Sequence, residues 1–466
     1  MTLKGKICAE KSNFVADYNI YQSLFINYFP IPAMKFLKSA TLLIISVLAG
    51  LSSRAENYPS RSDCLWITNP DHSDWLYETG DSAVISVELY RYGIPADGVT
   101  VSYEIGPDML PADSKGTLTL KNGRASVNIG TMKKPGFRDL RLVAEFDGHK
   151  FPHHVKVGFS PEKLTPFVRE PKDFKSYWEK AVAEDRKFPL IYSSEPVEKY
   201  TTDKMTCQLI RLQTTPGGKS MYAYLFIPKG GGKYPAVFCP PGAGVKTIKD
   251  PLIHRYYGEG GMIRIECEIH GVHPELSEQG FASERKARGN YLDQGLDDPD
   301  TYYMKDVYLG CRRFLDLLTS LPEWDGRNLF TQGGSQGGAL AITTAMLDDR
   351  VSGCVANHPA LSDMTGYLGD KTGGYPHHFR KNPSEATPEK IRTLEYYDVV
   401  NFARHLKCPV RMTWGFNDNT CPPTTSYEVY NVISSPKEAL LTPINEHWTT
   451  VPTERGHYEW IKSHCR

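Results

Sequence analysis

The chain has 466 residues, 40% of them hydrophobic and 23% charged, and its 54 basic side chains balance 54 acidic ones. This length exceeds that of one ordinary domain, so we expect at least two, with enough apolar material for a large core. A formal net charge of zero lacks the basic excess that is typical of nucleic-acid-binding proteins and favours a neutral substrate.

A short apolar segment near the start predicts secretion. Basic residues precede an apolar run at 40–51, and small residues suitable for cleavage follow at 53–55. The run is too short to span a membrane, which takes about 20 residues. Residues 1–55 are therefore expected to comprise an upstream extension and a signal peptide at 34–55, with Met34 as the natural start. The mature protein is expected to be secreted or periplasmic, with no membrane association.

The chain contains 10 cysteines, nine of them after Ala55. They include no Cys-x-x-Cys pair and no Cys/His cluster with the spacing of a zinc site. Cys239 and Cys354 lie within apolar segments, where a buried thiol packs as a small hydrophobic group. An oxidising compartment would allow one or two disulfides, but the sequence does not pair them.

Residues 56–160 have the pattern of an all-β domain. Apolar residues alternate with polar ones at 83–89, and two further short segments at 117–120 and 125–129 flank an Asn-Gly turn at 121–124, which predicts a hairpin. Short strands with closely spaced turns indicate a small immunoglobulin-like β-sandwich. We interpret it as a structural or substrate-orienting module, because it holds no catalytic cluster.

A proline-rich linker at 160–171 leads into a region, 168–466, in which apolar strands alternate with amphipathic helices. This alternation predicts an α/β domain with a mostly parallel sheet. Helices are expected at 174–183 and 301–321. The strands are expected at 222–227, 234–239, 262–267, 328–331, 351–356 and 408–414.

A Gly-x-Ser-x-Gly motif surrounds Ser335, between the predicted strand at 328–331 and a predicted helix at 339–347. This strand–turn–helix order is that of the nucleophile elbow of the α/β-hydrolase fold. Such a turn exposes the serine hydroxyl and aims the N–H of the next residue, Gln336, at a developing oxyanion. The alternative is a glycine-rich turn with a buried serine.

A nucleophilic serine needs a base and an orienting acid, which follow it in the order acid, then histidine in this fold. Asp418 comes directly after the predicted strand at 408–414, and His447 follows the next apolar run. Both positions lie at the carboxyl edge of a parallel sheet, where such sites are built. The alternatives are a turn-forming Asp418, a surface His447, and Glu446 as the acid.

The second oxyanion donor is expected in the glycine-rich loop that follows the strand at 234–239. We nominate the N–H of Ala243.

Four further histidines, at 270, 273, 377 and 378, have no carboxylate cluster of matching spacing. We therefore expect no metal and no cofactor.

From Phe174 onward the sequence resembles the acetyl xylan esterase and cephalosporin C deacetylase family. The resemblance is carried by residues 300–303, 307–309, 333–338 and 418–423. It implies an α/β-hydrolase fold with Ser335 as nucleophile, Asp418 as orienting acid and His447 as base. It also implies the removal of acetyl groups from small acetylated sugars and related acetyl esters. Members of the family often assemble into oligomers, which leaves a homo-oligomer open here.

Three segments depart from the family pattern. His270-Gly271-Val272 stands in place of an Arg-Gly-Gln motif, His447-Trp448 in place of His-Glu, and Pro241-Gly242 in place of His-Gly. The serine, acid and base are retained, so the departures concern the edges of the pocket and the assembly rather than the reaction.

The sequence thus predicts a secreted serine carboxylesterase that acts on acetylated oligosaccharides or other small acetyl esters. The alternatives are a serine peptidase of the prolyl-peptidase type on the same fold, and a non-catalytic carbohydrate-binding protein.

Overall fold

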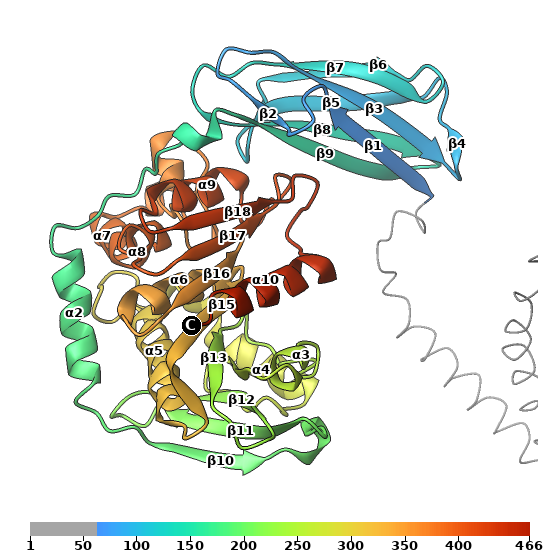
Figure 1. Cartoon of the computed structure of the whole chain (residues 1–466). Helices are drawn as coiled ribbons and strands as arrows, with labels where there is room; N and C mark the ends of the chain where they lie inside the picture. Colours follow the sequence, from blue (N-terminus) through green and yellow to red (C-terminus); the bar gives the residue numbers. More distant parts are fainter. Residues whose placement is uncertain (1–62) are drawn as a thin grey trace, which may run out of the picture. The chain divides into compact units, whose positions relative to one another are not determined.

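The computed structural model describes residues 63–466 (Figure 1). Residues 66–90 and 94–466 form one compact unit, so the N-terminal strands and the α/β region belong to the same body. No helix within the described residues combines the length and the apolar character that a membrane span needs. The predicted signal peptide at 34–55 and the extension before it lie outside the described residues.

The N-terminal strands form two sheets. One contains β1 (Cys64–Pro70), β3 (Ala83–Arg91), β4 (Ile94–Pro95) and β7 (Arg124–Gly130). The other has the order β2 (Leu76–Tyr77), β9 (His149–Phe159), β8 (Gly136–Phe146), β5 (Thr100–Pro107) and β6 (Ser114–Thr119). In this five-stranded sheet every pair is antiparallel except β2 with β9. That these sheets form an immunoglobulin-like domain stays a prediction.

The Asn-Gly turn at 121–124 forms, but the predicted hairpin around it is wrong. Asn122 and Gly123 have φ angles of 51° and 74°, as a two-residue turn requires. However, β6 pairs with β5 whereas β7 pairs with β3, so the turn carries the chain from one sheet to the other. The turn motif specifies the reversal of the chain but not the strand with which each arm pairs.

Side chains alternate strictly across the five-stranded sheet. Leu140 and Leu142 of β8 are fully buried, and Arg141 between them points to the opposite face. On β9, Val155 is buried with the leucines, and Lys156 lies on the face of Arg141. One face of the sheet is therefore apolar and the other carries charged side chains.

The α/β region is built on a nine-stranded sheet. Its order is β10 (Tyr192–Pro196), β11 (Met205–Gln213), β12 (Ser220–Pro228), β14 (Ile263–Cys267), β13 (Tyr234–Cys239), β15 (Trp324–Gly334), β16 (Gly353–Asn357), β17 (Val410–Trp414) and β18 (Lys437–Leu441). The pairs from β10 to β14 are antiparallel, and those from β14 to β18 are parallel. The carboxyl ends of β13, β15, β17 and β18 consequently share one edge.

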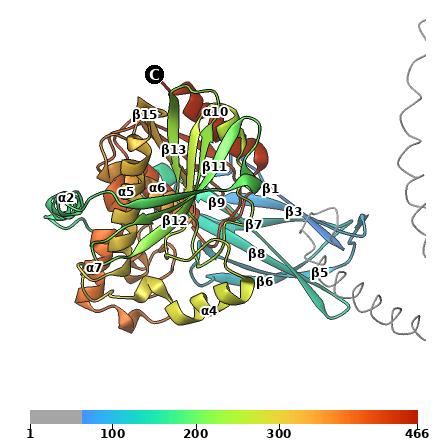
Figure 2. The same cartoon turned by 90° about the horizontal axis from the view of Figure 1, so that it is seen from below.

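Helices cover both faces of this sheet (Figures 1 and 2). Alternate residues of β13 enter two cores: Phe238 packs with α5 and α6, whereas Val237 packs with α10. The helices are α2 (Phe174–Asp185), α3 (Tyr256–Glu259), α4 (Glu278–Arg288), α5 (Tyr303–Ser320), α6 (Gln336–Leu347), α7 (Pro388–Tyr397), α8 (Val399–Ala403), α9 (Pro423–Val432) and α10 (Val451–Ser463). Short 3₁₀ helices occur at η2 (Pro161–Lys163), η3 (Glu198–Tyr200), η4 (Tyr291–Asp293), η5 (Gly366–Gly369) and η6 (Pro383–Glu385).

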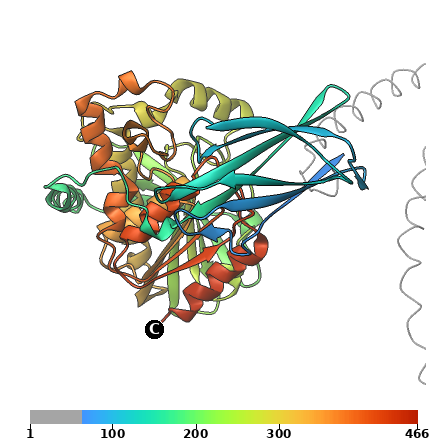
Figure 3. The same cartoon turned by 90° about the horizontal axis from the view of Figure 1, so that it is seen from above.

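The five-stranded sheet packs into the core of the α/β region, beside its C-terminal elements (Figure 3). Phe137 of β8 is 1% exposed, and its ring centroid lies 5.1 Å from that of Phe416 and 5.6 Å from that of Tyr427. These aromatic contacts join β8 to the loop after β17 and to α9.

Candidate active site

Ser335 makes a sharp turn between a strand and a helix. β15 ends at Gly334 and α6 begins at Gln336, which leaves Ser335 at φ 59° and ψ −126°. Residues with side chains rarely adopt this backbone conformation outside functional sites. A Cβ at Gly337 would lie 2.5 Å from the carbonyl oxygen of Pro240, so only glycine fits there. The segment is the predicted nucleophile elbow in form.

The elbow directs the Ser335 hydroxyl toward His447, which lies between β18 and α10. The Nε2 atom of His447 is 3.0 Å from the Oγ of Ser335. The Ser335 N–H donates to the carbonyl of Asn357 at 3.0 Å, and its carbonyl accepts from Ala360 at 3.0 Å. Hydrogen bonds thus hold both backbone groups of Ser335, and its hydroxyl points toward His447.

Asp418 lies on the other side of the same imidazole. Its Oδ2 is 2.7 Å from the Nδ1 of His447, and the residue is fully buried. Its Oδ1 accepts hydrogen bonds from the N–H groups of Thr420 at 2.7 Å and Cys421 at 2.8 Å. These two bonds orient the carboxylate, which leaves Oδ2 to accept the Nδ1 proton.

The structure therefore brings together Ser335, His447 and Asp418, the three residues nominated from the sequence. Glu446, the alternative acid, points elsewhere: its Oε1 is 3.6 Å from the Nε2 of His154 on β9. With Nδ1 protonated toward Asp418, the Nε2 lone pair of His447 faces the serine hydroxyl. Such an arrangement can remove the serine proton and return it to a leaving group.

The loop that carries Ala243 lies against the elbow. The contact is made by the carbonyl oxygen of Pro240, which packs closely against Gly337. Tyr291 of η4 joins the two segments: it accepts from the N–H of Gly244 at 3.3 Å and donates to the Oε1 of Gln336 at 2.6 Å. Burial raises the pKa of Tyr291, so its hydroxyl stays a donor. Tyr291 could not be identified from the sequence, since a tyrosine in an irregular segment carries no signal.

His358 packs against the imidazole of His447, with ring centroids 4.4 Å apart. Burial, followed by the charge of His447, lowers the pKa of His358 to about 4, so this ring is neutral at neutral pH. The ligand atoms of His358, Asp418 and His447 lie within 4.8 Å of one another, as in a metal site. Both nitrogens of His447 already contact Ser335 and Asp418, so a cation there would displace the serine. We assign no metal to this group.

The loop of Asp418 is anchored to β9 by a buried lysine. The Nζ of Lys156 is 2.8 Å from the main-chain oxygen of Asp418 and 2.8 Å from the Oδ1 of Asp108. The N–H of Lys156 donates to the Oδ1 of Asn417 at 2.9 Å. Lys156 is 0% exposed and Asp108 is 1% exposed. The sequence gives no sign of this contact, because alternation places Lys156 on the outer face of its strand.

Eight cysteines, from Cys207 to Cys465, are free thiols, and seven of them are buried. None of these eight joins a disulfide.

The sequence model of the acetyl xylan esterase family matches residues 162–464. The acetyl esterase Axe7A of Xylanibacter ruminicola is 54% identical over 434 residues, which cover 92% of this chain and 98% of that protein.

Two solved structures are similar to about two thirds of this chain. An acetyl xylan esterase from a Paenibacillus species has a TM-score of 0.57 and 25% identity, over 65% of this chain and 98% of its own. Acetyl xylan esterase 1 from a Thermoanaerobacterium species has a TM-score of 0.57 and 23% identity, over 66% of this chain and 98% of its own. These neighbours confirm the predicted α/β-hydrolase type of fold, with its mixed sheet.

Proposed function

This chain belongs to the acetyl xylan esterase family and is an acetyl esterase, a carboxylic ester hydrolase, and we propose that it deacetylates carbohydrates through Ser335, His447 and Asp418. The observation that carries the proposal is the hydrogen-bonded series from Asp418 through His447 to the Ser335 Oγ, with distances of 2.7 and 3.0 Å. It stands on loops at the carboxyl edge of the sheet, where α/β folds place their sites.

In the proposed mechanism, His447 takes the hydroxyl proton of Ser335 as Oγ attacks the acetyl carbonyl. Asp418 holds the imidazole in one tautomer and stabilises its charged form. The N–H groups of Ala243 and Gln336 stabilise the tetrahedral oxyanion, an effect on the order of 3 kcal/mol per donor. His447 then protonates the sugar oxygen, which leaves, and a water activated by His447 releases acetate from the serine.

The test is acetate release from acetylated xylo-oligosaccharides and from p-nitrophenyl acetate by the wild type and by Ser335→Ala. We expect wild-type turnover of both substrates and a fall of several orders of magnitude in the variant, whose circular dichroism spectrum stays unchanged. Ser320→Ala is the matched control, because its hydroxyl only donates to the Leu317 carbonyl at 2.7 Å. Near-normal turnover by Ser335→Ala would refute the assignment.

The same assay separates this proposal from a serine peptidase of the prolyl-peptidase type. Hydrolysis of an aminoacyl anilide at a rate comparable with the acetyl esters would favour the peptidase. The assignment as an acetyl esterase sets aside the non-catalytic carbohydrate-binding alternative.

The proposal extends to the organisation and location of the chain. We infer an immunoglobulin-like sandwich at 56–160, a catalytic domain at 168–466, and export directed by a signal peptide at 34–55. Export predicts a mature N-terminus near residue 56, which N-terminal sequencing of the exported protein checks. A mature chain that still contains residues 34–55 would contradict it. Light scattering of the purified enzyme would decide whether it forms a homo-oligomer.

A further inference from the structure

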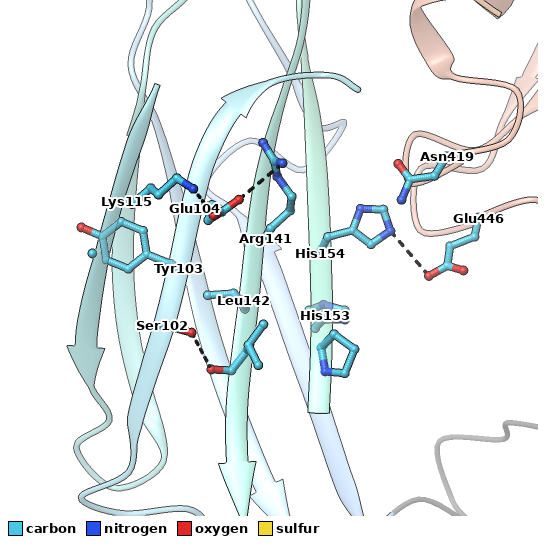
Figure 4. Close-up of a pocket in the computed structure, with 13 residues that line it drawn as sticks. Ser102, Tyr103, Glu104, Lys115, Arg141, Leu142, His153, His154, Asn419 and Glu446 are labelled. Atoms are coloured by element: carbon cyan, nitrogen blue, oxygen red, sulfur yellow. Dashed lines mark hydrogen bonds and ion pairs between the residues drawn. The ribbon is translucent and has the colours of Figure 1, made fainter. Parts of the chain in front are cut away.

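A groove of about 710 Å³ lies where the polar face of the five-stranded sheet meets the catalytic loops (Figure 4). Strands β5, β6, β8 and β9 form its wall on one side. Asn419 and Glu446 form it on the other. A volume of this size accommodates a ligand much larger than an acetyl group.

The groove follows from the register of the sheet. Lys115, Glu104, Arg141 and His154 stand directly opposite one another on β6, β5, β8 and β9. Because each occupies the same phase of the alternation, all four side chains project from the polar face. Glu446 continues this charged row from the loop of His447.

Within the row, Lys115 Nζ donates to Glu104 Oε1 at 2.5 Å, and the two other contacts leave hydrogen-bonding capacity. Arg141 Nη1 lies 3.6 Å from Glu104 Oε2, and His154 Nε2 lies 3.6 Å from Glu446 Oε1. Both separations exceed that of a hydrogen bond. The N–H groups and carboxylate oxygens can therefore still bond to hydroxyl groups of a ligand.

A second row beside the first is almost apolar. Ser102, Val143 and Pro152 stand opposite one another on β5, β8 and β9, and all three line the groove. The Oγ of Ser102 is engaged with the Val143 carbonyl at 3.3 Å. This row adds an uncharged strip beside the row of charged side chains on the same face of the sheet.

The charges of the groove balance. The cations of its lining are Lys115, Arg141 and protonated His154, and the anions are Glu104 and Glu446. The third anion, Asp139, does not line the groove but is buried beside it, where it pairs with both Arg141 and His154. A balanced site has no net attraction for an anion or a cation, so it suits an uncharged ligand with many hydroxyl groups.

The groove lies beside the loops that carry Asp418 and His447. Asn419 follows Asp418 in the chain and Glu446 precedes His447, so each pair of Cα atoms is separated by about 3.8 Å. The strands that form the other wall precede residue 162, where the family match begins. They supply a surface that the matched catalytic region does not contain.

We propose that this groove is a subsite for the uncharged main chain of an oligosaccharide whose acetyl group is being removed at Ser335. The proposal rests on the deacetylase function given above. In it, Arg141, His154 and Glu446 bond to sugar hydroxyls, while the row of Ser102 carries the apolar faces of the rings.

Two variants test the subsite. Ser102→Trp fills the groove, and Arg141→Met keeps the aliphatic stem of the side chain but removes its donors. Each should raise KM for acetylated xylo-oligosaccharides on the order of tenfold, with kcat/KM for p-nitrophenyl acetate within about twofold of wild type. Arg124→Met is the matched control, because Arg124 pairs with Glu88 in the other N-terminal sheet. Arg124→Met should leave the KM for the oligosaccharides and the kcat/KM for p-nitrophenyl acetate unchanged.

A second readout is calorimetric titration of unacetylated xylohexaose into Ser335→Ala and into Ser335→Ala with Ser102→Trp. Binding by the first and loss of binding in the second supports the subsite, even where wild-type deacetylation of the oligosaccharide fails. Oligosaccharide kinetics and binding that match wild type in both groove variants would overturn the subsite alone. An equal fall in kcat/KM for the oligosaccharides and for p-nitrophenyl acetate would also overturn the subsite, because damage to the catalytic loops would then explain the effect.

Discussion

The ammonium group of Lys156 lies 2.8 Å from the main-chain oxygen of Asp418, although 262 residues separate the two in the chain. A lysine on an N-terminal strand thus holds the loop of the proposed catalytic acid. Because Lys156 is fully buried, its charge depends on Asp108 for compensation.

Lys156→Met should impair both stability and turnover. The variant leaves Asp108 buried without its cation, which should lower the free energy of unfolding by about 3–5 kcal/mol. It also releases the oxygen of Asp418, so kcat for p-nitrophenyl acetate should fall while KM changes little. Urea unfolding and steady-state kinetics measure the two effects. Lys163→Met is the control: it removes only an exposed ion pair with Glu78 and should change neither the free energy of unfolding nor kcat.

Asp108→Asn in the Lys156→Met background separates the two roles. It removes the uncompensated charge and should restore part of the stability. The anchor of Asp418 stays absent, so kcat should remain low. If kcat recovers together with stability, Lys156 has a structural role only.

Tyr291→Phe should lower kcat by about tenfold with little change in KM. The hydroxyl bridges Gly244, the neighbour of the proposed oxyanion donor Ala243, and Gln336, the other proposed donor. A lost hydrogen bond of this kind costs about 1–1.5 kcal/mol. Steady-state hydrolysis of p-nitrophenyl acetate measures kcat and KM of the variant. Tyr308→Phe is the control, because that hydroxyl donates to the Tyr397 carbonyl. Equal kcat values for the two variants would contradict the bridging role.

Gly337→Ala should disable the enzyme without unfolding it. The new Cβ would lie 2.5 Å from the Pro240 carbonyl, a backbone atom that cannot rotate away, so the loop of Ala243 must shift. Loss of one oxyanion donor lowers kcat by about 10²–10³-fold. Gly456→Ala, whose Cβ meets only an arginine side chain at 3.7 Å, should retain activity. Wild-type kcat in Gly337→Ala would show that the loop does not contribute a donor.

His154 should make stability depend on pH. Burial lowers the pKa of His154, but Asp139 and Glu446 raise it more, to about 8, against the repulsion of Lys156. Because the folded pKa lies above the ordinary value of about 6.5, the stabilisation is complete below pH 6.5 and is lost as pH rises through 8. It amounts to at most about 2 kcal/mol.

Urea unfolding of wild type and His154→Gln at pH 6 and pH 9 measures this contribution. The wild type should be more stable than the variant at pH 6, and the gap should close at pH 9. His149→Gln, at the tip of the β8–β9 hairpin, serves as the control. A gap that persists at pH 9 would mean that packing, not charge, stabilises His154.

That Ser335, Asp418 and His447 come together could be predicted because their signals are local. Ser335 stands within a motif whose glycines are needed by the turn, and Asp418 and His447 each follow a recognisable strand. The central strands of the α/β region and the helices α2, α5 and α6 were predicted to within a few residues, whereas α4, α7 and α10 were not predicted. β11 was not predicted, since polar residues such as Gln208 and Arg211 interrupt its apolar positions.

The groups that support the site could not be predicted. Lys156 and His154 occupy equivalent outward positions on β9, yet one is fully buried and the other borders a groove. The difference arises from a loop far away in the chain, and no strand pattern encodes it. The partner of β7 was mispredicted for the same reason, because a turn motif specifies the turn and not the sheet.

The position of Phe137 bears on how this protein can be divided or recombined. Its ring packs against those of Phe416 and Tyr427, next to the loop that Lys156 holds. A fragment that begins after residue 160 would present both rings and a loosened acid loop to water. The N-terminal strands are therefore not a detachable accessory, and an exchange of this module between enzymes must carry equivalents of Phe137 and Lys156 with it.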